Sequence, residues 1–122
     1  MTDIEMAREA IESTYIGECD IVEYVTIKND ITKRNEHKEE KVLEKQKCRI
    51  SFKNISNSNQ SETTNNVTQT IKLFISPDIN IKNGSKIIVT QNGKKQEYKN
   101  SGEPARYETH QEIMLELFKG WA

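Results

Sequence analysis

The chain has 122 residues and a mass of 14.1 kDa, which suits one domain and leaves no room for two ordinary ones. Its 18 Lys and Arg residues oppose 19 Asp and Glu residues, so the formal charge is -1. This balance argues against a strongly basic nucleic-acid binder and against an acidic disordered tail. We expect no membrane span, because no long apolar run occurs, and no secretory signal, because residues 1–10 are acidic and amphipathic.

The first segment predicts a short helix over residues 3–15. Thr2 or Asp3 can cap it, because their side-chain oxygens accept hydrogen bonds from the free N–H groups of a first turn. Acidic residues near the start suit the helix dipole, and Gly17 is placed to end the helix. The apolar residues follow helical spacing at Ile4, Ala7, Ala10, Ile11 and Tyr15.

After Gly17 the chain favours strands. Ile outnumbers Leu by 15 to 4, and residues branched at Cβ suit a pleated strand better than a helix. Apolar and polar residues alternate in several short runs, and both faces of the first run carry apolar side chains, as at a barrel seam. The expected strands are residues 19–27, 46–52, 69–76, 86–91, 94–99 and 110–118.

The turns between these runs predict hairpins. Asn92-Gly93 accepts the positive φ values of a type I′ turn and joins two of the expected strands, and Asn83-Gly84 precedes the first of them. The last run also fits helical spacing at Ile113 and Leu117, but a strand is favoured because it completes a meander. Short strands at close spacing indicate a mainly β fold, a small antiparallel β-barrel or sandwich with a short N-terminal helix.

Catalytic and cofactor-binding motifs are absent from the sequence, including the phosphate-loop, dinucleotide, nucleophile-elbow and zinc-protease patterns. His37 and His110 lack Cys or Asp neighbours at metal-ligand spacing. Cys48 alternates with core positions and is expected to be a buried, inert thiol. Cys19 and Cys48 form no C-x-x-C pair, so we expect a reduced intracellular compartment. The sequence predicts a protein that is not an enzyme, with no cofactor and no metal site.

Two polar stretches interrupt the compact part of the chain. Residues 28–41 contain one apolar residue, Ile31, and residues 53–68 contain two, Ile55 and Val67. Ordering a polar loop costs conformational entropy without apolar burial, so such a loop is a disordered linker or a functional segment that orders against a partner. The mixed charges of residues 28–41 also suit the tip of a long exposed hairpin.

Charge is segregated along the chain. Residues 1–27 carry a net charge of -6, whereas residues 28–53 and 71–100 each carry +4. A basic face of this kind can meet DNA phosphates, but the lysines lack the interleaved aromatic residues on which bases stack. A charged surface that orients a protein partner agrees equally well with the sequence.

The second half of the chain carries an ordered series of short segments, and through them it resembles a family of phage proteins. The segments are IKLFISP (71–77), NGSKIIVT (83–90) and YKNSG (98–102), followed by Pro104, Tyr107, HQEI (110–113) and Leu115. In this order and spacing the chain resembles the head-closure, or stopper, proteins, which are small head–tail connectors of tailed bacteriophages and related prophages. The resemblance covers residues 48–122 well and residues 1–47 in outline.

The resemblance implies a β-barrel-like subunit of the virion, made in the bacterial host cytoplasm. Copies would assemble as a ring, expected to be twelvefold, between the portal or adaptor ring of the DNA-filled head and the tail proteins. In related stoppers a long loop projects into the channel and helps to retain packaged DNA, and residues 53–68 would be that loop. The residues expected to line the channel are Asn57, Ser58, Asn59, Gln60, Ser61, Glu62, Thr63 and Thr64.

Beyond Lys53, Glu62 is the one charge of this loop, so its contact with DNA would be weak and non-specific. Phe118 and Trp121 are candidates for partner contact, since terminal aromatic residues either fold back onto the core or dock elsewhere. Two other functions stay open. One is a tail-completion or tail-terminator protein of similar β architecture, and the other is a small nucleic-acid-binding module with an OB-like barrel.

Overall fold

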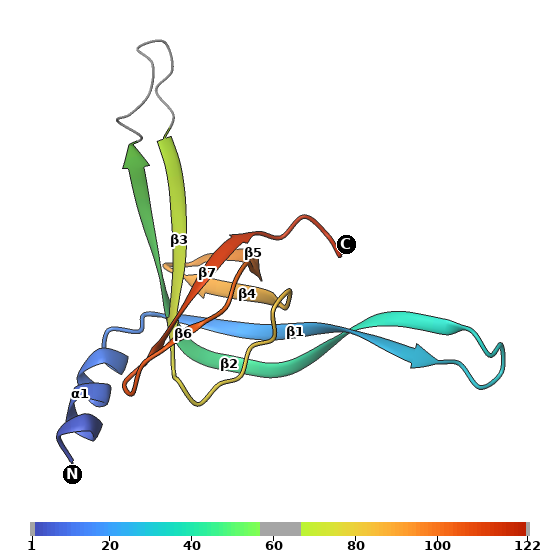
Figure 1. Ribbon diagram of the computed structural model, residues 1–122, viewed down its shortest axis with the longest axis horizontal. Coiled ribbons are helices and arrows are strands. Elements are labelled where there is room, and N and C mark those ends of the chain that lie inside the picture. The colour runs from blue at the N-terminus through green and yellow to red at the C-terminus, as the bar shows by residue number, and fades with distance from the viewer. Residues whose placement is uncertain (1, 57–66, 122) are drawn as a thin grey trace.

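The structure, a computed structural model, describes residues 2–56 and 67–121. It confirms a mainly β fold with a short N-terminal helix (Figure 1). The elements described within these ranges are α1 (Asp3–Glu12), β1 (Gly17–Lys28), β2 (Asn35–Ser56), β3 (Val67–Ile75), β4 (Lys86–Gln91), β5 (Lys94–Asn100), β6 (Ala105–Arg106) and β7 (Gln111–Leu117).

Six of the strands close into an antiparallel barrel. Their order is β3-β2-β1-β4-β5-β7, and β3 also pairs with β7, which joins the two ends of the sheet. The short strand β6 adds to β7 outside this ring. Between the two predicted architectures, the structure shows the barrel, and the C-terminal run is the strand that closes it. Asn92 and Gly93 adopt φ values of 53° and 75°, as the predicted type I′ turn requires.

The predicted alternation places the core correctly within the barrel. The buried apolar residues from the predicted runs include Cys48, Ile50, Ile71, Leu73, Ile75, Ile113 and Leu115. Phe52 and Leu117 were expected on the same faces, but they are 52% and 50% exposed. They stand at the ends of the inward-facing series, where β2 and β7 run past the packed interior.

The connection between β3 and β4, residues 76–85, covers the end of the barrel that lies away from Phe52 and Leu117. Ile81 is buried and Ile79 packs against the core cluster. The amide of Gln111 donates hydrogen bonds to the carbonyl oxygens of Ser76 (2.7 Å) and Ile79 (2.5 Å). Asn100, also fully buried, donates to the same connection at 3.3 Å. The buried side-chain amides of Gln111 and Asn100 therefore hold this connection in place, because they donate hydrogen bonds to its backbone carbonyl groups.

Helix α1 begins as predicted, with Thr2 as its cap. The Thr2 hydroxyl accepts a hydrogen bond from the backbone N–H of Glu5 (3.1 Å), and the Glu5 carboxylate accepts one from the N–H of Thr2 (3.3 Å). In the parts of the chain that the structure covers, no helix has both the length and the apolar character that a membrane crossing demands.

The helix ends at Glu12, three residues before the predicted end of the range 3–15. The hydroxyl groups of Ser13 and Thr14 each donate a hydrogen bond of 2.6 Å to a carbonyl oxygen of the last turn. These bonds use acceptors that a continuing helix would need. Gly17, which was expected to end the helix, instead begins β1.

Strand β2 is 22 residues long, and the barrel and two projecting hairpins share it. It pairs with β1 as far as Cys48 opposite Gly17, and with β3 from Cys48 opposite Ile75 outwards to Ser56 opposite Val67. Most of the polar stretch 28–41 is therefore hairpin, as one interpretation allowed. The predicted loop 53–68 is too long, because residues 53–56 and 67–68 are paired strand.

A side chain completes the barrel wall where β2 exchanges partners. Beyond Cys48 the pairing of β2 with β1 stops. The backbone N–H of Ile50 donates to Gln91 Oε1 (2.9 Å), and Gln91 Nε2 donates to the Ile50 carbonyl (3.2 Å). Gly17 leaves room for this amide, since a Cβ there would lie 3.1 Å from Gln91 Oε1. The Gln91 amide thus replaces a missing strand at this edge.

We predict that Leu73→Asp prevents cooperative folding. Leu73 is fully buried, and an unpaired carboxylate in the core costs more free energy than a small domain has to spare. Gln69→Asp, on an exposed position of the same strand, is the matched control and should fold normally. Circular dichroism during heating measures both variants, and unchanged thermal stability of Leu73→Asp would contradict the inward register of β3.

Candidate functional site

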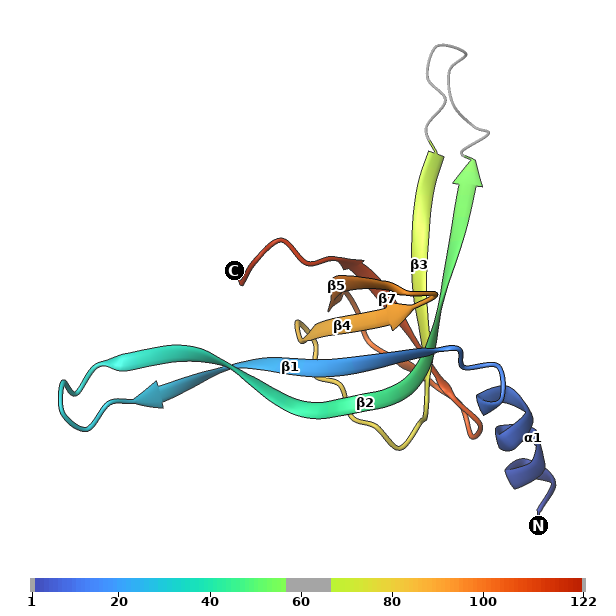
Figure 2. The ribbon, with the colours of Figure 1, turned by 180° about the vertical axis from the view of Figure 1, so that it is seen from behind.

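Two hairpin arms leave the barrel in different directions (Figures 1 and 2). The β1–β2 arm comprises residues 23–42, and the β2–β3 arm begins with residues 52–56 and 67–70. Helix α1 and the tip of the β1–β2 arm lie at opposite ends of the long axis in both views, while the β2–β3 arm points away from that axis. The molecule therefore offers three separate projections around one barrel.

The predicted channel residues, Asn57 to Thr64, lie outside the described residues, so their role stays a prediction. The structure does show the pair of strands that leads to these residues. The pairing of β2 with β3 is continuous over nine residue pairs, from Cys48 opposite Ile75 to Ser56 opposite Val67. A ribbon that is anchored in the barrel wall therefore leads directly into the predicted segment.

An irregularity in β2 redirects the β1–β2 arm. The register between β1 and β2 shifts on both sides of Ile21, and Lys45 has a left-handed φ of 51°. The backbone N–H of Lys45 donates to Asp20 Oδ1 (2.9 Å), while Lys41 Nζ lies 3.4 Å from Asp20 Oδ2. The Lys45 hydrogen bond, and after it the positive charge of Lys41, lower the pKa of the Asp20 carboxyl below its ordinary value of 3.8.

The hydrogen bond between the Lys45 backbone and Asp20 predicts that the β1–β2 arm is sensitive to acid. Because the pKa of Asp20 is lower in the folded protein, its stabilisation is complete above the unfolded value and is lost as the pH falls through the folded value, below 3.8. We expect the Lys45 amide to lose protection from hydrogen exchange over that range. In Asp20→Asn the Lys45 amide should be less protected, and its protection should not change with pH. Asp30→Asn, at the arm tip, should behave as wild type. Identical profiles for all three proteins would contradict this role of Asp20.

Phe118 and Trp121 fold back onto the β1–β2 arm. Trp121 Nε1 donates a hydrogen bond of 2.9 Å to Glu39 Oε1, and its ring meets Tyr24 edge-on with centroids 4.8 Å apart. The Phe118 ring packs edge-on against Trp121 at 5.0 Å, and Tyr24 meets His37 across the arm at 5.3 Å. The two rings pack against the arm, whereas the predicted fold-back was onto the core. Partner contact by these rings stays a prediction.

Lys86 lies at the centre of this contact. Its side chain is 9% exposed, and its Nζ lies 3.1 Å from Glu39, 3.0 Å from Glu97 and 4.7 Å from the centroid of the Phe118 ring. Burial by itself would lower the pKa of the Lys86 ammonium, but the hydrogen bonds to Glu97 and Glu39 outweigh it and raise the pKa above 10.5. A charged lysine therefore ties the barrel wall, the arm and the C-terminal segment together.

We predict that Trp121→Ala loosens the β1–β2 arm without unfolding the barrel. The substitution removes the bond to Glu39 and the two edge-on ring contacts, with a stability loss of about 1 kcal/mol. Hydrogen exchange at residues 23–26 and 37–40 should accelerate, while exchange at β3 and β7 should not. Trp121→Phe, which keeps a ring but loses the donor, should give an intermediate rate. Equal exchange rates in all three proteins would show that Trp121 does not hold the β1–β2 arm.

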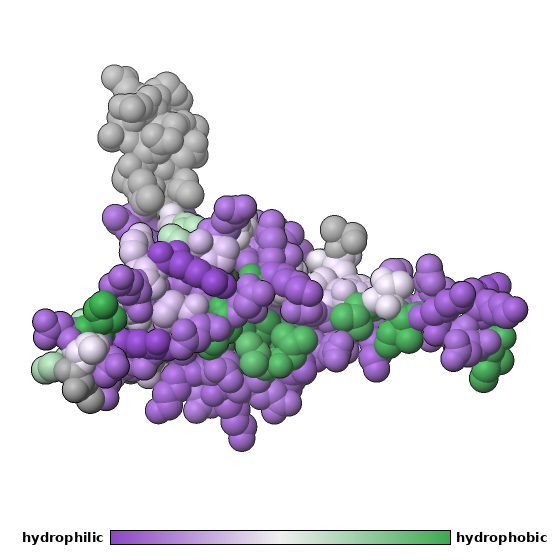
Figure 3. Space-filling view, turned by 60° about the horizontal axis from the view of Figure 1, so that its bottom comes forward, coloured by the Kyte–Doolittle hydropathy of each residue, from purple (hydrophilic) through white to green (hydrophobic). Residues whose placement is uncertain are grey.

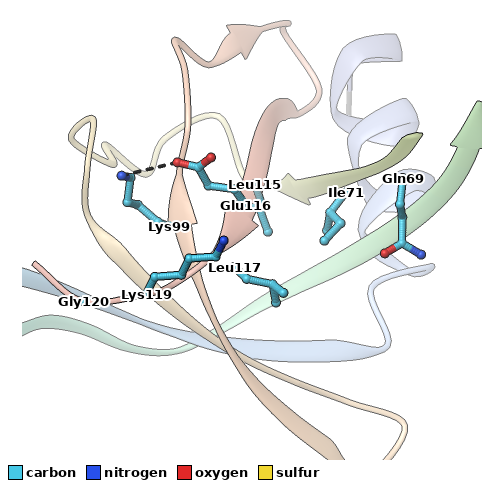
Figure 4. A pocket seen from close by; sticks show the side chains of 8 residues that line it. All are labelled: Gln69, Ile71, Lys99, Leu115, Glu116, Leu117, Lys119 and Gly120. Carbon is cyan, nitrogen blue, oxygen red and sulfur yellow. Dashed lines mark ion pairs between the residues drawn. The ribbon is translucent and has the colours of Figure 1, made fainter. Parts of the chain in front are cut away.

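The end of the barrel beside the β2–β3 arm is open. A pocket of about 480 Å³ there is lined by residues that include Phe52, Tyr98 and Leu117. A neighbouring pocket of about 360 Å³ is shown in Figure 4, where Lys99 reaches across to Glu116 at 3.3 Å. Exposed aromatic side chains such as Phe52 are enriched in protein contact surfaces, whereas lysines are depleted there.

Cys48 is buried, as its alternation with core positions predicted. Cys19 and Cys48 are buried free thiols, and the mutual hydrogen bond together with burial raises the pKa of Cys19. His37 is exposed on the arm, and His110 is half-buried with its Nε2 3.0 Å from Glu112. Within residues 2–56 and 67–121, no three potential metal ligands gather in one place.

Sequence reasoning missed the residues that orient the arms. Asp20, Lys86 and Gln91 each act on a segment distant in the chain or on an irregular backbone position. Lys86 is one of many lysines, and nothing beside it in the sequence distinguishes it. Asp20 alternates with Cys19 and Ile21 as an ordinary outward-facing polar residue would, so its neighbours do not distinguish it either.

Comparisons with known proteins bear on the fold. No protein-family model and no curated protein matches this chain. Among solved structures, the chain is similar to protein xkdH of the phage-like element PBSX from Bacillus subtilis, with a TM-score of 0.51 and 11% sequence identity. The match covers 82% of this chain and 91% of that chain. At this level of identity, the similarity establishes a shared fold.

Proposed function

We propose that this protein is a structural subunit of a phage head–tail junction. In this proposal it is a head-closure, or stopper, protein of the virion whose copies form a ring between the portal or adaptor and the tail. The observation that carries the proposal is the β2–β3 arm, a paired ribbon that leaves the barrel wall and leads into the polar residues Asn57 to Thr64. The similarity of the fold to a protein of a phage-like element supports a phage origin.

The arm suits a position at an aqueous channel. Its paired backbone resists bending more than a single loop would, so it can hold a segment at a defined distance from the barrel. The segment beyond Ser56 is polar and carries one charge, Glu62. Such a segment can face water without a loss of apolar burial, and it would touch packaged DNA without binding it tightly.

The alternatives receive less support. A tail-completion or tail-terminator protein would also form a ring, but that role leaves the β2–β3 arm without a task. Single-stranded nucleic-acid binding needs aromatic side chains in a row along a basic groove. Three exposed aromatic residues of the described chain lie apart from one another, with Tyr24 on the β1–β2 arm, Phe52 beside the barrel mouth and Tyr107 after β6.

We predict that replacing residues 55–66 with a short Gly-Ser linker gives folded subunits and leaky heads. The assay measures DNA retained in phage heads and attachment of tails, with circular dichroism as the check on folding. A second variant, with a Gly-Ser segment of the natural length, separates the effect of reach from that of the side chains. Normal DNA retention and normal tail joining in the short variant would overturn the channel role.

A further inference from the structure

Helix α1 attaches to the barrel through the hydrogen bonds of one side chain. Arg8 donates hydrogen bonds to Ser76 (2.6 Å) and to Asp78 (2.7 Å), and it also pairs with Glu12 (3.0 Å). An amphipathic helix ordinarily turns its apolar stripe towards the core. Here the stripe of Ile4, Ala7 and Ile11 meets the barrel only at Ile11, which is half-buried, whereas Ile4 is 48% exposed. The part of this stripe that extends beyond the barrel is therefore free to contact another surface.

A small pocket at the foot of the helix extends this surface. It measures about 230 Å³, and Ile11 and Phe74 supply apolar walls. Tyr15 also lines it, and although Tyr15 is only 9% exposed, its hydroxyl has no hydrogen-bond partner within the described chain. The Tyr15 hydroxyl oxygen itself is closed off from the surface, so the pocket offers an incoming side chain mainly its apolar walls.

The tip of the β1–β2 arm presents a side chain that fits such a surface. Ile31 is 93% exposed. The turn that carries it is held in shape, because Asn29 Oδ1 accepts hydrogen bonds from the N–H groups of Ile31 (2.9 Å) and Thr32 (3.2 Å). The N–H of Asn29 also donates to the Arg34 carbonyl (2.9 Å), which closes the turn. Ile31 is thus an exposed apolar side chain on a turn whose conformation is fixed by hydrogen bonds.

The charges of the two surfaces are opposite. Helix α1 carries four carboxylates against Arg8, a net charge of -3, whereas residues 28–34 carry a net charge of +2. The helix and the arm tip lie at opposite ends of the long axis, and Figure 3 shows apolar side chains at both ends. One copy therefore cannot bring its own two surfaces together, but two copies can.

We propose that the tip of the β1–β2 arm of one copy docks onto helix α1 and the adjoining pocket of a second copy. Ile31 would enter the apolar surface, and Lys33 and Arg34 would face the acidic helix. Each copy offers one surface of each kind, so the contact is heterologous and repeats into a ring or a filament. The inference deepens the proposed function by naming the contact between subunits.

The test is sedimentation of the purified full chain at increasing protein concentration. Wild type should associate reversibly. Lys33→Glu with Arg34→Glu, and separately Asp3→Lys with Glu9→Lys, should each weaken association at least about tenfold, because each leaves like charges facing one another. Combining all four substitutions should restore association, which an effect on the subunit fold alone would not do. Ile31→Asp should abolish association while leaving thermal stability unchanged.

Lys47→Glu with Lys94→Glu changes two exposed lysines outside both surfaces and should associate as wild type does. A wild type that stays monomeric at every concentration would overturn the proposal, and so would association that the four-residue variant fails to recover. The variant that lacks residues 55–66 should still associate. Failure of this contact therefore appears in purified protein, whereas failure of the channel role appears as normal DNA retention in phage heads.

Discussion

Strand β2 is shared by the barrel and by both arms, and the other features depend on how it changes partners. Cys48 pairs with Gly17 on one side and with Ile75 on the other, so it is the point at which one ribbon ends and the next begins. A strand with a partner on only one edge leaves backbone groups unpaired. The Gln91 amide satisfies those of Ile50, which allows the barrel to close although β1 has ended.

Polar contacts, rather than the core, orient the projecting parts. Asp20 satisfies the backbone where β2 is irregular, and Lys86 joins the barrel to the arm and to the C-terminal rings. A core of this size lies within the barrel and cannot extend along two-stranded ribbons, which have no second layer to pack against. The directions of the arms are therefore set by a few hydrogen bonds and ion pairs at their roots.

Because the core is confined to the barrel, some apolar side chains of the projecting parts lie outside it. Ile4 and Met6 on the helix and Ile31 on the arm tip add nothing to the subunit's own core. In a protein that works as one copy among many, such residues can be buried between copies. The proposed contact between subunits and the proposed channel role of the β2–β3 arm use different projections of the molecule, so the two can operate together.

Local pattern was sufficient for the strands that face the barrel interior. Alternation identified Leu73, Ile75 and Ile113 as core, and Asn92-Gly93 marked its hairpin, because each depends on residues within a few positions of one another. It failed at the polar ends of β2, since a ribbon is held by backbone pairing that needs no apolar alternation. Closure of β3 on β7, the Gln91 bridge and the fold-back of Trp121 join residues about 40 or more positions apart. No local signal encodes such distant contacts, so the three-dimensional packing alone decides them.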